Sequence, residues 1–256
     1  MKVSIITITF NRAHLIGETI QSVLNQTYPN FEHIIIDDGS TDDTEAVVKS
    51  FNDNRIKYFK YEKTGNLSKL HNYGLKHATG NSISILDSDD LWLEDKLEFV
   101  VSVFKNNPEV KFIIHNIQYF NATEGLAKNY YNYQNNFCKN VLDEVLLFTI
   151  LPFPVFTLKR EILTEVDYLD EFFTDGQQDF FIRVASKYNI YFISKSLTKI
   201  RQHKNNTHKN IKNIPYFTNY YFTLYRLLLN KKISLNLFIK GASLNSKNWI
   251  AEILKM

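Results

Sequence analysis

The run Ile85-Leu86-Asp87-Ser88-Asp89-Asp90 carries an apolar, strand-like pattern directly into three carboxylates. Residues 82–86 combine serine with isoleucine and leucine, which predicts a buried strand. In open α/β sheets, ligands bind at the carboxyl ends of the strands, where these acids lie. Carboxylates this close repel one another unless a cation neutralises them, so the run predicts a Mg²⁺ or Mn²⁺ site. The alternative is a solvated turn whose last Asp caps a helix that begins near Trp92.

The composition is that of an ordinary protein that can bury a full core. Its 256 residues and 44% hydrophobic content fit one large α/β domain, alone or with an appendage. The formal net charge of +3 is too small to indicate nucleic acid as a partner. The single cysteine, Cys138, excludes an intramolecular disulfide and is typical of a reducing compartment.

The start of the chain and its hydropathy predict a cytoplasmic location. Residues 1–6 enter a strand pattern at once and contain no small-residue cleavage site, so we expect no signal peptide. No uninterrupted apolar run approaches the roughly 18 residues that a membrane-spanning helix needs.

Strand and helix patterns alternate up to about residue 115, which is the signature of βαβ units and a largely parallel sheet. We expect strands at 3–10, 33–36, 55–61, 82–86 and 110–115, and helices at 13–25, 44–51, 67–78 and 94–105. The later part is less regular. Residues 116–140 are rich in Asn, Tyr and Phe and predict a long loop. Beyond them we expect helices at 141–149 and 176–188, a strand at 190–194, and helices again from Ile211.

Polar residues gather at three predicted strand ends and at one helix start. The four segments are Thr9-Phe10-Asn11-Arg12, Asp37-Asp38-Gly39-Ser40, Asp87-Ser88-Asp89-Asp90 and Gly176-Gln177-Gln178-Asp179. Parallel neighbouring strands end at the same edge of a sheet, so the first three segments should face one crevice. This convergence favours a binding or catalytic site over a set of unrelated turns.

In their order and spacing, these segments resemble family 2 glycosyltransferases with a GT-A fold. Further matching pieces are Asn72-Tyr73-Gly74, Phe180-Phe181-Ile182-Arg183 and Arg201-Gln202-His203. The resemblance implies a GT-A catalytic domain at 1–210, an α/β domain whose mixed, mostly parallel sheet is flanked by helices. Within it, 1–115 is the nucleotide-binding half and 116–210 the acceptor-binding half. Residues 211–256 are then a C-terminal helical appendage.

The resemblance also implies an inverting, metal-dependent transfer of a sugar from a nucleotide donor, usually a UDP-sugar. The residues expected to bind the nucleotide-sugar are Thr9, Asn11, Arg12, Asp38, Asn72, Asp87, Ser88 and Arg201. Asp38 is expected to accept hydrogen bonds from uracil, with capping of its loop as the alternative. Asn72 has the alternative of satisfying local backbone.

The metal ligands that the resemblance implies are Asp89 and His203, for Mn²⁺ or Mg²⁺. A cation that bridges the diphosphate stabilises the departing UDP. Asp87 supports Asp89 by reaching the ribose or a metal-bound water. Asp90 is interpreted as a helix cap, and a structural role is the alternative for His203.

Asp179 resembles the catalytic base of the family. An inverting displacement needs a carboxylate within hydrogen-bond reach of the acceptor hydroxyl, so that the hydroxyl loses its proton as it attacks. Gln178 stands where the family usually has Glu, so we expect either the orientation of the acceptor or the pKa of Asp179 to differ from the family's, because a neighbouring charge is missing. The alternative for Asp179 is a cap on the helix that follows it.

Acceptor contacts are expected from Trp92, Tyr130, Tyr131 and Gln178. Apolar faces of sugars pack on aromatic rings, which is why the aromatic residues are candidates. Core packing is the alternative for Trp92.

The C-terminal segment has two interpretations. Residues 216–229 are apolar nearly all round and are followed by Lys231 and Lys232, so a helix here could lie on an anionic membrane surface near a lipid-linked acceptor. Otherwise the segment packs on its own domain or on a partner, such as a second copy of the chain in a homodimer.

The predicted function is transfer of a sugar to a glycan or lipid-linked glycan in envelope polysaccharide synthesis. One rival is a sugar-nucleotide pyrophosphorylase, which needs a glycine-rich, basic phosphate loop that Thr9-Phe10-Asn11-Arg12 does not provide. The other rival is a non-catalytic module that binds nucleotide-sugars, which the replacement at Gln178 favours.

Overall fold

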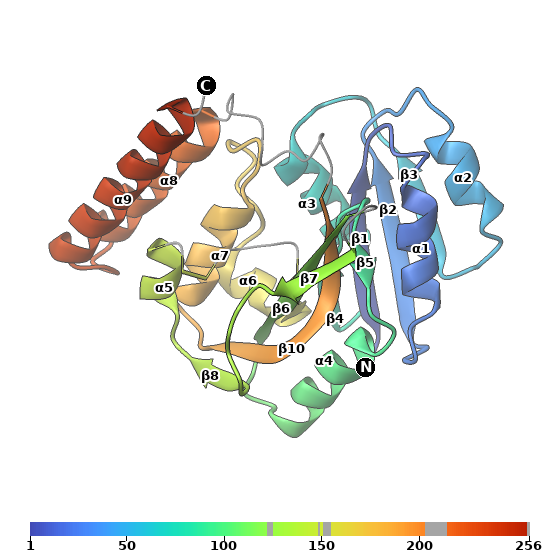
Figure 1. The fold of residues 1–256 in the computed structure, drawn as a ribbon, viewed down its shortest axis with the longest axis horizontal. Coiled ribbons are helices and arrows are strands. Elements are labelled where there is room, and N and C mark those ends of the chain that lie inside the picture. The colour runs from blue at the N-terminus through green and yellow to red at the C-terminus, as the bar shows by residue number, and fades with distance from the viewer. Residues whose placement is uncertain (122–124, 148, 151–154, 203–213, 255–256) are drawn as a thin grey trace.

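The amino-terminal half consists of parallel strands joined by helices, as the alternating sequence pattern predicts (Figure 1). The computed structural model describes residues 1–121, 125–147, 149–150, 155–202 and 214–254. The first strands are β1 (Val3–Thr9), β2 (Phe31–Asp37), β3 (Ile56–Lys60) and β4 (Ser82–Ile85). The helices between them are α1 (Ile16–Leu24), α2 (Thr44–Ser50) and α3 (Leu67–His77). β1 pairs in parallel with both β2 and β4, and β2 pairs in parallel with β3.

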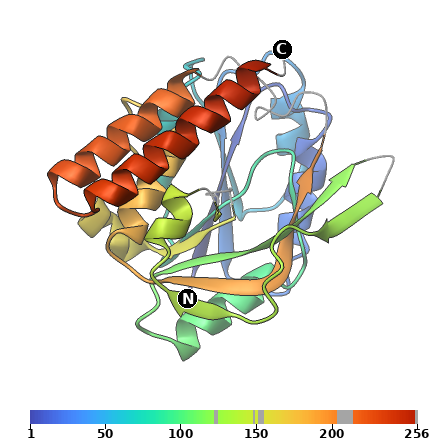
Figure 2. The same cartoon turned by 60° about the vertical axis from the view of Figure 1, so that its left-hand side comes forward.

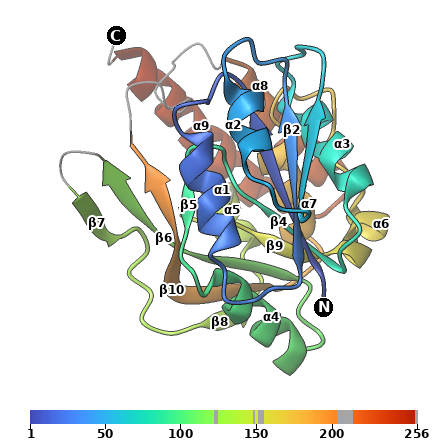
Figure 3. The ribbon, with the colours of Figure 1, turned by 90° about the vertical axis from the view of Figure 1, so that its right-hand side faces the viewer.

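Successive residues of β2 pack against helices on opposite faces of the sheet. Ile35 belongs to a buried cluster with Ile16 and Ile20 of α1. Ile34 and Ile36 belong to the cluster that contains Leu70 of α3. Figure 3 shows α1 and α3 on opposite sides of this part of the sheet. Burial on both faces explains why the strand is a continuous apolar run instead of an alternating one.

The second half extends the same sheet with mixed pairing. Its strands are β5 (Leu91–Trp92), β6 (Phe112–Asn121), β7 (Gly125–Asn129), β8 (Phe137–Lys139), β9 (Thr157–Lys159) and β10 (Ile190–Arg201). Its helices are α4 (Lys96–Asn106), α5 (Leu142–Leu146), α6 (Leu163–Val166) and α7 (Gln177–Ala185). In the described residues the strand order is β3-β2-β1-β4-β9-β6-β10-β5, with β7 on β6 and β8 on β10. β6 and β10 are parallel, whereas β9 is antiparallel to both of its neighbours.

Residues 116–140 contain more regular structure than the predicted loop. β6 continues to Asn121 and pairs with β7, and β8 pairs antiparallel with β10. The amide of Asn116 donates to the carbonyl of Tyr131 at 2.7 Å and accepts its N–H at 2.9 Å. The prediction of a loop was wrong because pairing with β10, far away in sequence, stabilises these strands where local periodicity is weak.

The chain ends in two helices, α8 (Ile214–Leu229) and α9 (Leu235–Leu254), which lie side by side (Figure 2). Leu224 and Leu227 of α8 are buried in the same core cluster as Val145 of α5. The predicted alternative, in which this segment packs on its own domain, is therefore confirmed for the inner face of α8. In the part of the chain that the structure describes, no helix combines the length and apolarity that crossing a membrane would require.

A buried acid, Glu32, ties together the starts of the strands, at the end of the sheet opposite to the acids at 87–90. Glu32 of β2 is 2% exposed. It accepts hydrogen bonds from Ser4 Oγ (2.6 Å), Lys57 Nζ (2.8 Å), Lys2 Nζ (2.9 Å) and the Thr79 N–H (2.7 Å). Burial alone would raise the pKa of Glu32, but these hydrogen bonds outweigh it and hold that pKa below its ordinary value. The charge is tolerated because it is paired and fully hydrogen-bonded.

We expect Glu32→Gln to lower the free energy of unfolding by about 3 kcal/mol at pH 7. A depressed folded-state pKa stabilises the protein above the unfolded value of 4.5, and this stabilisation is lost as the pH falls toward the folded value. Urea titrations at pH 7 and pH 3 should therefore show a smaller difference between wild type and variant at pH 3. Glu62→Gln, on the exposed surface, is the control. An equal difference at both pH values would contradict this account.

Candidate functional site

The acids at 87–90 lie beyond β4, at the edge where β1 and β2 also end. Leu86 donates its backbone N–H to the carbonyl of Ile6 at 3.0 Å, so pairing with β1 continues up to the residue before Asp87. The chain passes from β1 to β2 on one side and later returns to pair β4 on the other side. This reversal is the topological switch point at which open α/β sheets bind their ligands.

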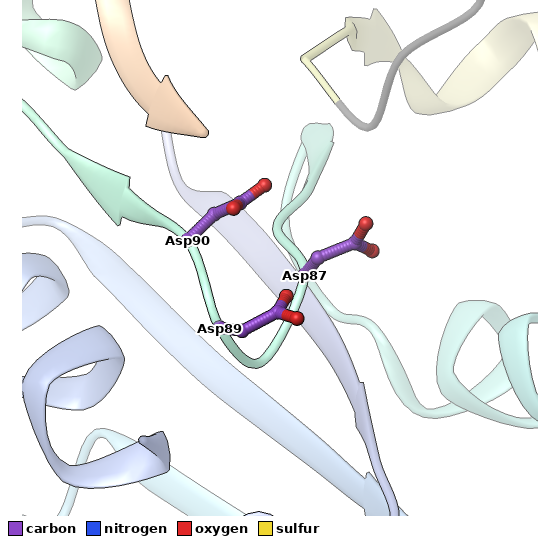
Figure 4. A group of neighbouring side chains, drawn as sticks. All are labelled: Asp87, Asp89 and Asp90. Atoms are coloured by element: carbon purple, nitrogen blue, oxygen red, sulfur yellow. The ribbon is translucent and has the colours of Figure 1, made fainter. Parts of the chain in front are cut away.

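Three carboxylates project from one tight turn at this point (Figure 4). Ligand oxygens of Asp87, Asp89 and Asp90 all lie within 4.8 Å of one another. Thr19 Oγ1 of α1 fixes the turn, since it lies 3.0 Å from the carbonyl oxygen of Ser88 and 2.9 Å from that of Asp90. The backbone thus holds the acids together independently of any ligand.

The electrostatics of the turn fit a divalent cation. Burial, followed by the charges of Asp89 and Asp175, raises the pKa of Asp87 to about 8. Burial and the charges of Asp87 and Asp89 raise the pKa of Asp90 as well. Arg12 Nη2 lies 3.7 Å from Asp89 and supplies one positive charge. A set of oxygen ligands with this mutual repulsion is suited to Mg²⁺ or Mn²⁺.

Asp90 does not cap a helix, so that interpretation was wrong. The N-cap position of α4 is held by Asp95, and β5 lies between it and the turn. Asp90 Oδ1 accepts the backbone N–H of Arg201 at 2.9 Å. Arg201 Nε donates to the carbonyl of Asp89 at 2.9 Å, and Nη2 pairs with Glu18 at 2.7 Å. Arg201, expected to bind the donor, therefore holds the acidic turn from the end of β10.

The loop after β1 approaches the end of β2. The carbonyl of Thr9 accepts the N–H of Asp38 at 2.9 Å, while the buried Oγ1 of Thr9 makes no hydrogen bond. Asn11 adopts a left-handed φ of 50° and accepts the N–H of Thr41 at 2.9 Å. Buried hydroxyls without a partner are uncommon, so Thr9 is a candidate for contact with a ligand.

The carboxylate of Asp38 is buried and is already hydrogen-bonded. It accepts bonds from Lys63 Nζ at 2.8 Å and from the N–H groups of the next two residues at 2.7 and 3.0 Å. These bonds use three of the roughly four acceptor positions of a carboxylate. Lys63 Nζ also lies 3.2 Å from the ring centroid of Phe10. Capping of the loop falls to Asp37, which accepts the N–H of Ser40 at 2.7 Å.

The side-chain amide of Asn72 is hydrogen-bonded within the protein. Its Nδ2 donates to the carbonyl of Leu169 and to Glu171 Oε1, both at 2.9 Å, and its Oδ1 accepts the N–H of Leu169 at 3.0 Å. Both amide hydrogens are thus used within the protein. These bonds tie α3 to the segment before α7, and a contact of Asn72 with the nucleotide stays a prediction.

Asp179 lies in the first turn of α7 and is 4% exposed. Its Oδ2 accepts Arg183 Nε at 2.8 Å, and its Oδ1 accepts Thr223 Oγ1 of α8 at 2.8 Å. Gly176 occupies the N-cap position, so Asp179 does not cap the helix either. The cavity beside it has a volume of about 10 Å³, the room of a single water molecule.

Asp175, which no motif singles out, is a second acid at the start of α7. It is exposed and lines the same cavity as Asp179 and Gln178. Its charge contributes to the raised pKa of Asp87 and opposes the burial that lowers the pKa of His71. Gln178 is 8% exposed, and its Nε2 has no hydrogen-bond partner among the described residues. An Asp-Gly pair is also an ordinary turn signal, which explains why the sequence alone does not reveal this residue.

Two of the three aromatic residues expected to stack on an acceptor are buried. Trp92 is 3% exposed in the core, with Lys96 Nζ 3.4 Å from its ring centroid, so the core alternative holds for Trp92. Tyr131 is 8% exposed and packs on Phe192 at 5.4 Å between ring centroids. Both assignments were wrong because residues distant in sequence pack around these rings: Val3 and Ile5 share the buried cluster of Trp92, and Phe192 contacts Tyr131. Tyr130 is 39% exposed and stays a prediction. His203 lies outside the described residues.

Comparisons with known proteins agree with this arrangement. The family model Glycosyl transferase family 2 matches residues 4–165. An Escherichia coli protein, UDP-Glc:alpha-D-GlcNAc-diphosphoundecaprenol beta-1,3-glucosyltransferase WfgD, is 42% identical over 127 residues, which cover 49% of this chain and 49% of WfgD. The chain spans between about a third and a half of the length of the first curated relatives that it matches.

Solved structures share the fold. TarS 1-349 of S. aureus in complex with UDP-GlcNAc has a TM-score of 0.76 at 18% identity and covers 100% of this chain and 73% of its own. The mannosyltransferase PcManGT from Pyrobaculum calidifontis, in complex with GDP-Man and Mn²⁺, has a TM-score of 0.70 at 20% identity, over 98% of this chain and 73% of its own. The fold is thus the GT-A fold that the sequence predicted, and the chain belongs to glycosyl transferase family 2.

Proposed function

We propose that this protein is an inverting, metal-dependent glycosyltransferase that moves a sugar from a UDP-sugar to a hydroxyl of a glycan or lipid-linked glycan in envelope polysaccharide synthesis. The main support for this function is the cluster of Asp87, Asp89 and Asp90 at the topological switch point of the sheet. The names of WfgD, with its UDP-Glc donor and diphosphoundecaprenol-linked acceptor, and of the TarS complex support the classes of donor and acceptor.

Asp89 and Asp87 are the proposed metal ligands, with His203 as a further candidate. Mn²⁺ or Mg²⁺ fits the oxygen cluster, and the PcManGT complex contains Mn²⁺. Such a cation, when bound, stabilises the negative charge of the departing diphosphate. Asp90, fixed to Arg201 by its hydrogen bond, helps to hold the turn in place.

The donor is proposed to lie along the ends of β1 and β2. Thr9 offers an unpaired hydroxyl, and Asp38 retains about one acceptor position for the uracil imide. Asn11, Arg12 and Ser88 are proposed to flank the donor between its uracil ring and the acidic turn. Arg12, 3.7 Å from Asp89, is placed to pair with phosphate oxygens as well.

Inversion needs a carboxylate on the side of the anomeric carbon opposite to the leaving diphosphate. The start of α7 supplies two acids, Asp175 and the predicted base Asp179. Gln178, with its unpaired Nε2, is the proposed partner for an acceptor hydroxyl.

The outer face of the C-terminal helices is proposed to contact the cytoplasmic face of the membrane. Phe222, Tyr225 and Leu229 of α8 are 44, 53 and 63% exposed. Lys231 and Lys232 follow Leu229 after one intervening residue, Asn230, and are exposed too. Apolar side chains beside lysines fit the interface of an anionic bilayer, where a lipid-linked acceptor would be found.

With Mn²⁺, we expect the protein to release UDP from one member of a panel of UDP-glucose, UDP-galactose and their N-acetyl forms, slowly even when water is the acceptor. A thermal-shift screen that includes GDP-mannose selects the donor, and coupled detection of UDP measures turnover. Binding of a UDP-sugar without any UDP release would favour the non-catalytic module. Formation of UTP on addition of pyrophosphate would favour the pyrophosphorylase.

Asp89→Asn should weaken Mn²⁺ binding by more than about tenfold, since it removes a charged ligand from the cluster. Isothermal titration with Mn²⁺ in the presence of UDP measures this effect. Asp43→Asn, an exposed acid at the start of α2, is the matched control. Equal Mn²⁺ affinity of Asp89→Asn and wild type would place the metal elsewhere.

Vesicles rich in phosphatidylglycerol should co-sediment the full-length chain, and the double variant Phe222→Ser/Leu229→Ser should pellet several-fold less. Phe99→Ser on α4, which changes an equally apolar but distant side chain, should pellet like wild type. The full chain is needed because truncation would remove the buried Leu224. Equal pelleting of all variants, with a dimeric mass in solution, would assign this face to a homodimer instead.

A further inference from the structure

The carboxylate of Asp179, the acid expected to act as the base, is held at both of its oxygens. Oδ2 accepts Arg183 Nε at 2.8 Å, and Oδ1 accepts Thr223 Oγ1 at 2.8 Å. Arg183 is itself fixed, because its Nη2 donates to the carbonyl of Tyr168 at 2.8 Å. One anchor of the acid therefore lies in its own helix, α7, and the other lies in α8, 44 residues further along the chain.

The second anchor fixes the plane of the carboxylate of Asp179. The torsion that turns a carboxylate is soft and roughly two-fold, so a hydrogen bond at Oδ2 alone would leave the plane free to swing. The bond from Thr223 at Oδ1 removes that freedom. Two bonds occupy about half of the roughly four acceptor positions of a carboxylate, so Asp179 can still accept the proton of a hydroxyl.

Thr223 uses its single hydroxyl hydrogen for this contact. A threonine inside a helix can donate instead to a carbonyl three or four residues earlier in the same helix. Within the described part of the chain, Thr223 Oγ1 makes no such bond and donates to Asp179. Thr223 is 3% exposed, so water does not compete for the bond. The hydroxyl is therefore dedicated to the acid.

α8 also forms one wall of the space beside Asp179. The cavity of about 10 Å³ is lined by Asp179 and Gln178 of α7 and by Asn219 and Thr223 of α8. A space of this size holds one water molecule, and the hydroxyl oxygen of an acceptor has the same size. The residues of α8 thus border the place where a hydroxyl can approach the acid.

The helix that presents Thr223 is anchored in the core on the same face. Leu224, the next residue, is fully buried in the main core cluster. The hydroxyl of Tyr220 donates to the carbonyl of Leu146. A Cβ on Gly241 of α9 would lie 2.9 Å from that hydroxyl, so α9 packs closely against α8 at this point. Thr223 is therefore held toward Asp179 by packing on both sides of α8.

We infer that Thr223 is a positioning residue for Asp179 and that α8 belongs to the catalytic unit of this protein. This inference rests on the proposed glycosyltransferase function, with Asp179 as its base. In that reaction the acceptor oxygen bonds to the anomeric carbon, and its proton passes to Asp179. The bond between the anomeric carbon and the diphosphate oxygen breaks, and its electron pair leaves with UDP. Thr223 keeps its own proton and sets the direction in which the carboxylate meets the hydroxyl.

The test compares UDP-sugar hydrolysis by Thr223→Val and Thr223→Ser in the full chain with Mn²⁺, well below the Tm of each variant. Valine has nearly the shape of threonine without the hydroxyl, and kcat should fall by about tenfold or more, because a misplaced catalytic group is costly. KM for the UDP-sugar should stay within about twofold of wild type, since donor binding is untouched. Serine keeps the hydroxyl and should restore kcat to within about threefold of wild type.

Tyr221→Phe is the matched control, because it removes a hydroxyl from the same helix without touching Asp179. The hydroxyl of Tyr221 contacts Ser246 Oγ and lies 3.1 Å from the carbonyl oxygen of Ala242, both on α9. This variant should keep the kcat of wild type. Thr223→Ala, which a helix tolerates well, replaces Thr223→Val in the comparison if the valine variant does not fold.

Three results would overturn the assignment of Thr223: wild-type kcat without its hydroxyl, failure of Thr223→Ser to restore kcat, or an equal loss of kcat in Tyr221→Phe. The last of these would show that kcat reports only how firmly the two C-terminal helices pack. Absence of UDP release by wild type from every donor would instead overturn the proposed function.

Discussion

The functional edge of this protein depends on holding three carboxylates within 4.8 Å of one another against their repulsion. Parallel pairing of β4 with β1 delivers the turn to the sheet edge, and Thr19 and Arg201 fix its backbone. Arg12, whose Nη2 lies 3.7 Å from Asp89, supplies a positive charge beside it. Burial and the remaining repulsion raise the pKa of Asp87, and a divalent cation would relieve that repulsion.

Two sets of hydrogen bonds join the two halves of the chain. Arg201 brings the end of β10 to the back of the acidic turn. The N-terminal turn of α3 is hydrogen-bonded to the segment before α7. These hydrogen bonds connect elements of the two halves before any ligand binds, and the proposed displacement reaction would require such preorganisation.

The C-terminal helices take part in this arrangement as well as covering the core. Thr223 of α8 reaches the carboxylate of Asp179, and Leu224 is buried in the main core cluster. Movement of α8 would thus be felt at the first turn of α7. The same helix carries the exposed apolar side chains of Phe222, Tyr225 and Leu229.

The sequence by itself determined the βαβ half of the fold, the family and the acidic turn, because apolar periodicity and strand-end acids are local signals. It placed β1 to β4 and α1 to α3 within a few residues of their observed bounds. Only the tertiary structure decided which polar side chains are free. Asp90, Asn72, Trp92 and Asp179 all sit in motifs or strand ends, yet each is engaged by partners far away in sequence. Asp175 belongs to no motif, and its side chain is exposed. The physical reason is that burial and hydrogen-bond partners are set by packing between distant segments, which no local pattern encodes.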